Sequence, residues 1–274
     1  MTHSGWSAAL VAAALIAFAA PAGAQTPTPF VPNDEQLGRM PDDFTLSFCV
    51  DPRDPSWEVD QAIGEAIAGA LLVEPAVHVV ENPAVREDLD TLYRRLRSDC
   101  SMYFGFKLLA GVYPSWLTVT RPYYDVGYVL VTKNPDWTKL GDIPMTEAIG
   151  PTIGTAVDFR LIQYLNSLGA SHWKRFPQAT DENALDALER GEISAALVWG
   201  PSYNALVKAR PEFAGLRTIA LDPLPPSDIP VGAVLLSDDT FLRNSVDQAI
   251  GSLIADGTIE KILADHGFQA TIPK

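Results

Sequence analysis

The sequence predicts an α/β protein of two lobes, each a largely parallel sheet covered by helices. From residue 44 onward, apolar runs typical of strands alternate with stretches of helical periodicity. The alternation fills two successive units, with candidate crossing segments at 126–133 and roughly 229–236. The chain of 274 residues has room for two lobes of ordinary size. Lobes joined by two extended crossings enclose a cleft and can close by a hinge motion.

The first unit has the order β-α-β-α-β, which favours a parallel sheet wrapped by helices. Apolar runs predict its strands at 44–50, 76–80 and 101–106. An apolar stripe with helical spacing predicts its first helix and consists of Val59, Ile63, Ile67 and Leu71. Asn82 and Pro83 are typical of a cap and a first helical residue, so we expect the second helix to begin there.

The second unit repeats the alternation. We expect its strands at 126–132, 152–154 and 193–198, followed after a proline-dense loop by a strand at 231–237. We expect helices over 157–168, over 181–190 and from Pro201 to about residue 210. Two further helical patterns, around 242–253 and 259–263, close the chain and can pack back on the first unit. The expected division is lobe 1 at 44–127 plus 236–274, and lobe 2 at 128–235.

The N-terminal residues predict export. Residues 1–24 combine an apolar core with the small-residue site Ala22-Gly23-Ala24, as in a cleaved signal peptide. The alternative is a retained anchor, but the apolar run from Trp6 to Ala20 is shorter than the roughly 20 residues of a spanning helix. Residues 25–43 hold four prolines and no apolar period, so we expect a tether. The expected location is the periplasm, with no membrane insertion after cleavage.

The net charge of −14 excludes two classes of partner. No Asp, Glu, Lys or Arg lies in residues 1–24, so this charge belongs to the exported part. Nucleic acids and anionic lipids both require basic surface, so neither is an expected partner.

Cys49 and Cys100 both lie in the part expected to be exported, where pairing is favoured. A bridge would close a loop of about 50 residues and contribute roughly 3–4 kcal/mol on the loop-entropy model. The alternative is two buried thiols. Cys49 ends one predicted strand and Cys100 begins another, and parallel neighbours in simple register would hold them too far apart.

Signatures of catalysis or metal binding are absent from the sequence. It holds no Gly-x-Ser-x-Gly, no phosphate-binding loop, no Gly-x-Gly-x-x-Gly, no Cys-x-x-Cys and no His-x-x-x-His. His78, His172 and His266 have no neighbours that suggest a ligand set, and we expect core or surface roles for them. We therefore expect no metal, no cofactor and no catalytic residue.

Candidate ligand-binding residues cluster where predicted strands end, which is where open α/β sheets bind ligands. In the first unit they are Asp51, Trp57, Phe104, Lys107, Arg121, Tyr123 and Tyr124. In the second they are Gly154, Thr155, Trp199, Gly200 and Tyr203. Backbone amides after Gly154 begin a predicted helix and could accept an anion or a carbonyl oxygen. Trp199-Gly200-Pro201 would form a wall of the cleft, with Pro201 starting a helix.

Each candidate has a structural alternative. Trp57 could staple its helix, and Asp51 could cap the turn at Pro52. Arg121 could pair with a structural carboxylate, and Lys107 could be a surface lysine. Gly154 and Thr155 could be a turn and a helix cap. The aromatic side chains of Tyr123, Tyr124 and Trp199 could be core packing, because large rings usually bury.

Four motifs in this order resemble the periplasmic solute-binding proteins of ABC importers. They are Leu46–Trp57 (LSFCVDPRDPSW), Cys100 before the third strand, Val119–Thr132 (VTRPYYDVGYVLVT) and Ala195–Leu206 (AALVWGPSYNAL). More specifically, they resemble the branch of accessory J proteins of quinoprotein methanol dehydrogenases, over roughly residues 44–268. The resemblance implies a type II two-lobed periplasmic-binding-protein fold, with two hinge crossings and one antiparallel strand in each sheet.

The transport members of this family bind amino acids with an arginine after the third strand and an aspartate after a lobe-two strand. Here Phe106-Lys107-Leu108-Leu109 follows the third strand, and Trp199-Gly200 takes the place of the aspartate. An ammonium group would meet no carboxylate at that point, which argues against an ordinary amino-acid carrier.

Three functions follow as hypotheses. The first is a non-catalytic accessory, maturation or docking factor for a PQQ-dependent methanol (alcohol) dehydrogenase or its cytochrome, with a small molecule or a peptide segment in an aromatic cleft. The second is the substrate-binding component of an ABC importer for a small solute that is not a typical amino acid. The third is a dehydratase on the same scaffold, for which Asp51 or Asp158 would supply the acid or base. Fold alone does not decide between them.

Overall fold

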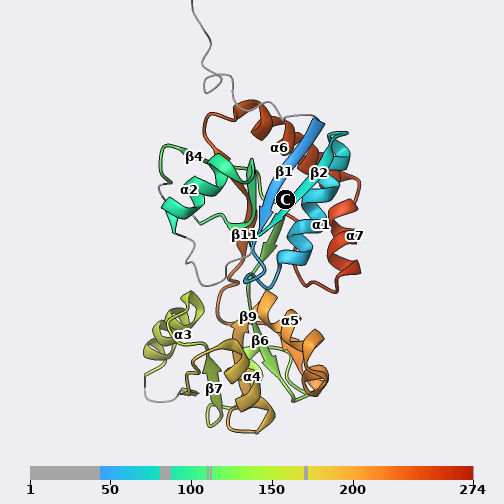
Figure 1. Cartoon of the computed structure of the whole chain (residues 1–274). Coiled ribbons are helices and arrows are strands. Elements are labelled where there is room, and N and C mark those ends of the chain that lie inside the picture. The colour runs from blue at the N-terminus through green and yellow to red at the C-terminus, as the bar shows by residue number, and fades with distance from the viewer. Residues whose placement is uncertain (1–43, 81–87, 110, 112, 170–171, 274) are drawn as a thin grey trace, which may run out of the picture.

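The computed structural model shows two α/β lobes joined by extended segments (Figure 1). It describes residues 44–80, 88–109, 111, 113–169 and 172–273. The predicted signal peptide, the tether and the helix start at Asn82-Pro83 lie outside the described residues. Within the described ranges, no helix has the length and apolar character needed to cross a membrane.

The sheet of lobe 1 mixes parallel and antiparallel strands. Its order is β2 (Glu74–Val79), β1 (Thr45–Val50), β3 (Met102–Lys107), β11 (Ile229–Leu236) and β4 (Leu117–Val119), with β5 (Tyr124–Val126) also on β11. Strand β1 pairs in parallel with β2 and β3. Strand β11 runs antiparallel to β3, β4 and β5. One strand therefore opposes the others in direction, as the family resemblance implied.

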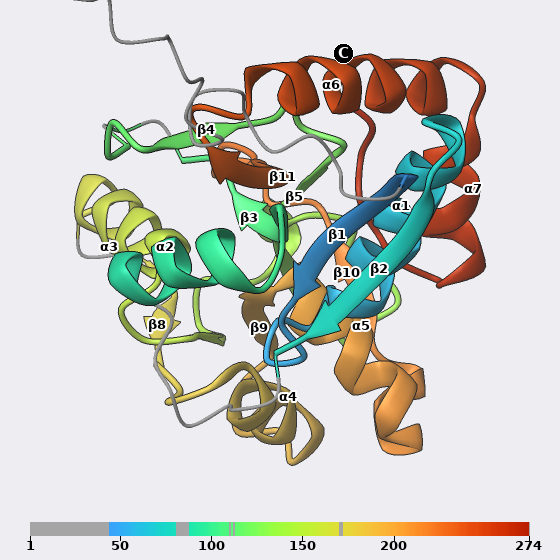
Figure 2. The same ribbon diagram turned by 45° about the horizontal axis from the view of Figure 1, so that its top comes forward.

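Helices cover both faces of this sheet (Figure 2). Helices α1 (Trp57–Ala70), α6 (Thr240–Ala255) and α7 (Thr258–Asp265) pack on one face, around a core that includes Phe48, Ile63 and Val246. Helix α2 (Leu89–Ser98) covers the other face through Leu92 and Leu96. The terminal helices thus return to the first unit, as predicted from their position in the chain.

Lobe 2 repeats the arrangement on a smaller scale. Its strand order is β10 (Arg217–Ile219), β6 (Tyr128–Thr132), β9 (Ala195–Trp199), β7 (Ala148–Pro151) and β8 (Lys174–Arg175), and β6 is antiparallel to β9 and β10. Helix α3 (Ala156–Ser167) packs on one face, while α4 (Asp181–Glu189) and α5 (Gly200–Ala209) contribute to the core on the other. Short 3-10 turns at Leu140–Asp142 and Pro211–Gly215 complete the lobe.

Two of the differences from the expected boundaries affect the division of the lobes and the start of α3. We expected lobe 2 to extend to residue 235, but Ile229–Leu236 is strand β11 of the lobe 1 sheet. Its run of buried apolar residues indicates a central strand and does not reveal which sheet receives it. We also expected a strand at 152–154, but β7 ends at Pro151. Gly154 there has a φ of +75°, which ends the strand in a turn before α3.

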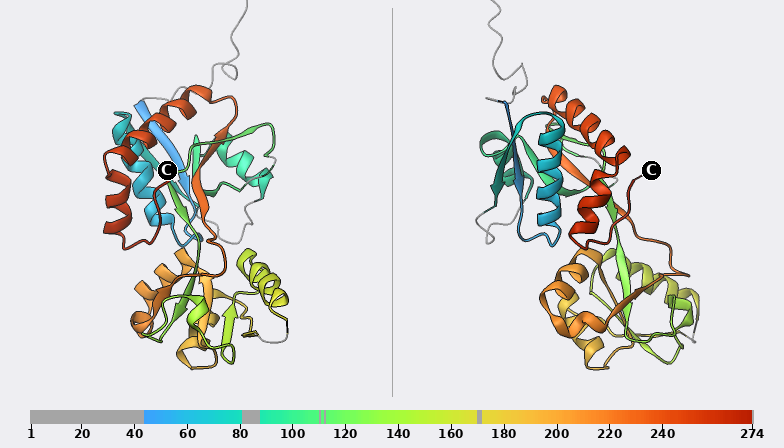
Figure 3. Two further views of the ribbon diagram at one scale, coloured as in Figure 1. Left: turned by 180° about the vertical axis from the view of Figure 1, so that it is seen from behind. Right: turned by 90° about the vertical axis from the view of Figure 1, so that its right-hand side faces the viewer.

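The two crossings run side by side. The first lies between β5 and β6 at Gly127, and the second leads into β11, with Val126 opposite Ile229. A Cβ atom on Gly127 would lie 2.8 Å from the carbonyl oxygen of Ser227, so only glycine permits this close approach. Figure 3 shows both segments passing between the lobes.

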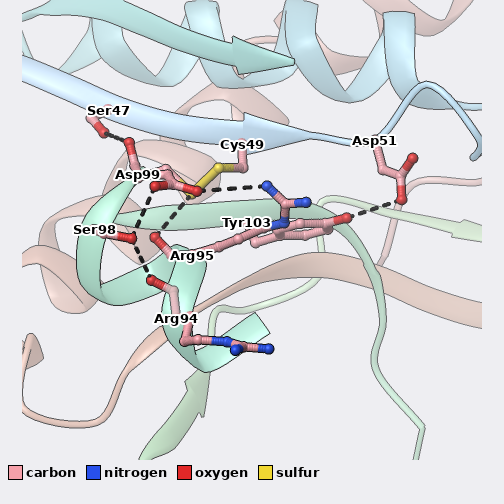
Figure 4. Close-up of a disulfide and its surroundings, with 9 residues drawn as sticks. Ser47, Cys49, Asp51, Arg94, Arg95, Ser98, Asp99 and Tyr103 are labelled. Carbon is pink, nitrogen blue, oxygen red and sulfur yellow. Dashed lines mark hydrogen bonds and ion pairs between the residues drawn. A yellow bond between two sulfur atoms is a disulfide. The ribbon is translucent and has the colours of Figure 1, made fainter. Parts of the chain in front are cut away.

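Cys49 and Cys100 form a disulfide with their Cα atoms 5.7 Å apart. The concern about register does not apply, because Cys49 lies opposite Tyr103 in the sheet and Cys100 precedes β3. The chain reaches β3 from α2, which crosses the face onto which the Cys49 side chain points. The disulfide therefore joins the end of β1 to the residue that follows the C-cap of α2, and Figure 4 shows the bridge next to Asp99.

Candidate ligand-binding cleft

A cavity of about 780 Å³ lies between the lobes. We call it the α1–α5 cavity. Lobe 1 lines it with Pro52, Arg53, Pro55, Trp57, Glu58 and Val59, and with His266 and Phe268 beyond α7. Lobe 2 lines it with Thr180, Asp181 and Glu182, and with Ser202, Asn204, Ala205, Leu206, Lys208 and Ala209 of α5. Its walls thus come from both lobes.

Of the candidate residues chosen from the sequence, Trp57 lines this cavity. Trp57 is the first residue of α1 and also packs against the apolar core of lobe 1. Trp57 thus packs against the core and also lines the cavity.

Asp51 lies at the end of β1, beside this cavity. Its carboxylate accepts hydrogen bonds from Arg53 Nε and Nη2. It also accepts one from the Tyr103 hydroxyl at 3.2 Å (Figure 4). Partial burial opposes ionisation, but the hydrogen bonds and the charge of Arg53 outweigh it and lower the pKa of Asp51. Asp51 is therefore an ionised partner of Arg53.

A second set of side chains joins the lobes beside the crossings, and we call it the interlobe contact: Lys107, Trp199 and Tyr128. Lys107 Nζ lies 5.2 Å from the centroid of the Trp199 ring, in cation–π geometry. It also pairs with Asp54 Oδ2 at 3.3 Å. Trp199 meets the Tyr128 ring edge-on, with centroids 5.0 Å apart. Lys107 at the end of β3 thus reaches across from lobe 1 to lobe 2.

The start of α3 is capped by the chain itself. The Thr155 hydroxyl accepts from the Asp158 amide, and Asp158 Oδ2 accepts from the Gly154 amide at 3.0 Å. Arg175 holds the same carboxylate through two bonds of 2.7 Å. Although burial opposes ionisation, Arg175 and the Gly154 amide lower the pKa of Asp158. The helix start that we considered as an anion site therefore already holds a carboxylate.

Tyr123 and Tyr124 are fully buried around a carboxyl group that the sequence analysis missed, Asp60. Both tyrosine hydroxyls donate to Asp60 Oδ1, at 2.9 and 2.8 Å, and Ser56 Oγ donates to Oδ2 at 2.8 Å. Burial and the nearby Asp54 raise the pKa of Asp60 to about 7, although the hydroxyl groups oppose the rise.

One signal in the sequence could have revealed Asp60. It shares the buried stripe of α1 with Ile63, Gly64 and Ile67, so an acidic residue occupies an apolar position. Gly105 completes its surroundings, because a Cβ there would lie 2.8 Å from Asp60 Oδ2.

The remaining candidates lie away from the cavity. Phe104 is a core ring between Phe48 and Tyr123. Tyr203 is buried in lobe 2, where its hydroxyl donates to the Leu216 carbonyl. Arg121 lies against α6. Its backbone amide donates a hydrogen bond to the Asp247 carboxylate, and its guanidinium lies beside Gly251.

Gly200 has a packing role. Its amide donates to the Gly127 carbonyl oxygen at 2.9 Å, and a Cβ would lie 2.7 Å from that oxygen. This contact ties the start of α5 to the first crossing. In the part of the chain that the structure describes, no three or more His, Cys, Asp or Glu side chains gather as metal ligands would.

Comparison with solved structures identifies the fold. The second substrate-binding domain of GlnP from Lactococcus lactis, in an open conformation, is 15% identical with a TM-score of 0.64, over 83% of this chain and 97% of that chain. The unliganded, open L-cystine solute receptor of Neisseria gonorrhoeae is 16% identical with a TM-score of 0.64, over 85% and 97%. A polar amino acid ABC uptake transporter substrate-binding protein from Streptococcus thermophilus is 15% identical with a TM-score of 0.62, over 84% and 88%.

Neither a family model nor a curated protein matches the chain. At these identities the structural similarity establishes the fold, which is that of the two-lobed, type II periplasmic binding proteins.

Proposed function

We propose that the chain is the extracytoplasmic solute-binding component of an ABC-type importer, and that its solute is small and is not a free amino acid. The observation that carries this proposal is a cavity walled by two lobes with separate cores, joined by adjacent crossings. Such lobes can rotate about the crossings and enclose a ligand. The substrate-binding proteins to which the chain is similar support the same class.

The exclusion of free amino acids rests on charge. A zwitterion requires a cation for its carboxylate and a carboxylate for its ammonium group. At the end of β3, Lys107 is already paired with Asp54, and at the end of β9 an indole, Trp199, stands where an acid would bind the amine. The start of α3 is occupied by Asp158. The described residues thus offer neither half of such a site at these positions.

The proposal is for a binding protein and not for an enzyme. A dehydratase would require an acid or a base facing the cleft. Asp51 and Asp158 were the candidates, and the carboxylate of each accepts hydrogen bonds from two guanidinium nitrogens of an arginine. We place the protein in the periplasm, after cleavage of the predicted signal peptide at 1–24.

Thermal unfolding in the presence of a panel of solutes tests the proposal. The panel contains the twenty amino acids, sugars, polyols, nucleosides and neutral aromatic compounds, each at 1–2 mM. A true ligand at about 100 times its Kd should stabilise the protein by about 2.7 kcal/mol. We expect such a shift with a member outside the amino acids, together with a smaller radius of gyration in solution scattering as the lobes close. Micromolar binding of a free amino acid would contradict the exclusion.

The second candidate is an accessory or docking factor for a PQQ-dependent methanol or alcohol dehydrogenase, or for its cytochrome. It is supported by the motifs that the chain shares with those accessory proteins, above all Ala195–Leu206. Capture of a purified dehydrogenase by the immobilised protein, with no response to any solute in the panel, would favour this function over import.

A further inference from the structure

We propose that the α1–α5 cavity binds a neutral, ring-bearing small molecule that carries a hydrogen-bonding group at its edge. This inference rests on the proposed function, because it assumes a ligand held between the lobes, and it adds the position and the chemical class. The cavity is separate from the interlobe contact, since Lys107, Trp199 and Tyr128 do not line it.

The size of the cavity suits a small molecule. Ligand pockets for drug-sized molecules occupy about 300–1,000 Å³, and this cavity measures about 780 Å³. Both lobes line it, so a ligand there would contact α1 and α5 together and would respond to lobe closure. A protein partner would require a much larger surface than this cavity offers.

Part of the lining is apolar and includes flat rings, while about half of the lining residues are polar or charged. Trp57 and Phe268 face the cavity from lobe 1, and Leu206 faces it from α5. Ala205 and Ala209, four residues apart on one face of α5, add only methyl groups. Small side chains opposite aromatic rings leave a space in which a flat apolar molecule fits between the lobes.

The charged side chains of the lining already have partners. Arg53 is held by Asp51, and Glu182 pairs with Arg210 at 2.9 Å. Glu58 of lobe 1 pairs with Lys208 of lobe 2 at 3.1 Å.

Asp181, the remaining acidic side chain of the lining, accepts from the Thr152 hydroxyl at 2.5 Å. An ionised ligand would have to break one of these interactions or leave its own charge desolvated. A neutral ligand would do neither.

Two polar groups of the lining retain hydrogen-bonding capacity. Asn204 lines the cavity, and its Nδ2 is shielded from solvent without a hydrogen-bond partner among the described residues, so a turn of this side chain would present an unpaired donor to a ligand. His266 Nδ1 lies 2.9 Å from the Ile262 carbonyl oxygen, which can only accept, so Nδ1 donates to it and Nε2 is left for a ligand. A hydroxyl at the edge of the ligand could bond to both groups, whereas a carbonyl could accept only from Asn204 Nδ2.

A matched pair of fluorescent probes tests the inference on the full exported protein. N-phenyl-1-naphthylamine is neutral, and 8-anilinonaphthalene-1-sulfonate has the same ring system with a fixed negative charge. We expect the neutral probe to bind with micromolar Kd and the sulfonate at least about tenfold more weakly, a difference of about 1.4 kcal/mol. Equal affinity for the two probes would overturn the inference of a neutral ligand.

Variants locate the binding position. Ala205→Trp fills the cavity from α5 and should weaken binding of the neutral probe at least about tenfold. Ala264→Trp adds the same ring at an exposed position of α7 and should leave the affinity within about twofold. Trp57→Ala should weaken binding, and Trp57→Phe should restore most of it because a ring is retained.

The outcomes for the site and for the function are distinguishable. If the neutral probe binds Ala205→Trp as well as the wild type, the cavity is not the site and the inference fails. If a solute from the panel still binds that variant with unchanged affinity, the inference fails while the importer proposal stands. If the probe follows the variants as expected but no solute binds, the cavity assignment is supported and the importer proposal fails.

Discussion

At the scale of single residues, the buried carboxyl group of Asp60 should make stability depend on pH. Its pKa is about 7 in the folded protein against an ordinary value of 3.8. Between these two pH values the folded state holds a proton that the unfolded state has lost. The contribution of Asp60 to the free energy of unfolding is therefore complete below about pH 4 and is lost as pH rises through 7. The loss amounts to about 4 kcal/mol.

The variant Asp60→Asn isolates this effect, because its amide is neutral at every pH and can still accept from both tyrosines. Urea unfolding between pH 4 and pH 8 should show the wild type losing stability relative to the variant. Asp51 and Asp158, whose pKa values are lowered, contribute with the opposite sign at lower pH, so the difference between the two proteins is the quantity to measure. Glu65→Gln, on the exposed side of the same helix, is the control. Parallel curves for wild type and Asp60→Asn would show that Asp60 is ionised throughout.

At the scale of elements, the junction between β9 and α5 depends on Gly200. In Gly200→Ala the new Cβ would lie 2.7 Å from the Gly127 carbonyl oxygen, so α5 and the first crossing must separate. We expect a loss of about 1–3 kcal/mol in the free energy of unfolding. Gly69→Ala, in α1 with nothing within 4 Å of its Cβ, should instead be stabilised by about 0.5–1 kcal/mol. Urea denaturation of both variants measures the contrast, and an unchanged Gly200→Ala would refute the steric argument.

The elements themselves were largely predictable, because apolar periodicity reports local burial. The stripe from Val59 to Leu71 matches α1, and the run at 193–198 matches most of β9. What periodicity does not report is which face or which sheet receives a residue. Phe104 follows a predicted strand pattern, yet it points into the core, and β11 joins the sheet of lobe 1.

Most of the candidate site was beyond prediction for a related reason. The side chains that hold the candidate residues in place are distant from them in the sequence. Arg175, which binds Asp158, lies 17 residues from it, and Tyr123, which binds Asp60, lies 63 residues from it. The outer face of α5, with Ala205 and Ala209, reads in the sequence as an ordinary helix surface. It becomes a cavity wall only because lobe 1 lies opposite it.

At the scale of the whole molecule, three kinds of contact set the relative position of the lobes. The paired crossings at Val126 and Ile229 are continuous with the lobe 1 sheet and act as the hinge. The Lys107–Trp199 cation–π contact lies beside them, and the Lys208–Glu58 ion pair bridges α5 and α1 farther out. The last two are weak, at about 0.5–1 and 0.2–1 kcal/mol. The equilibrium between lobe arrangements should therefore be sensitive to single lysine substitutions.

Lys107→Met should shift this equilibrium about two- to fivefold toward separated lobes, because it removes the cation while keeping an unbranched apolar side chain. Lys208→Met should act in the same direction with a smaller effect that disappears at high salt, since its ion pair is exposed and screened. Spin labels at Ala70 and Gln163, exposed positions on α1 and α3, would report the distance distribution between the lobes by pulsed electron resonance. Lys261→Met, which removes an ion pair confined to α7, is the matched control and should leave the distribution unchanged. If Lys107→Met leaves the distribution as it is in the wild type, the crossings alone hold the lobes, and the interlobe contact contributes nothing measurable to their arrangement.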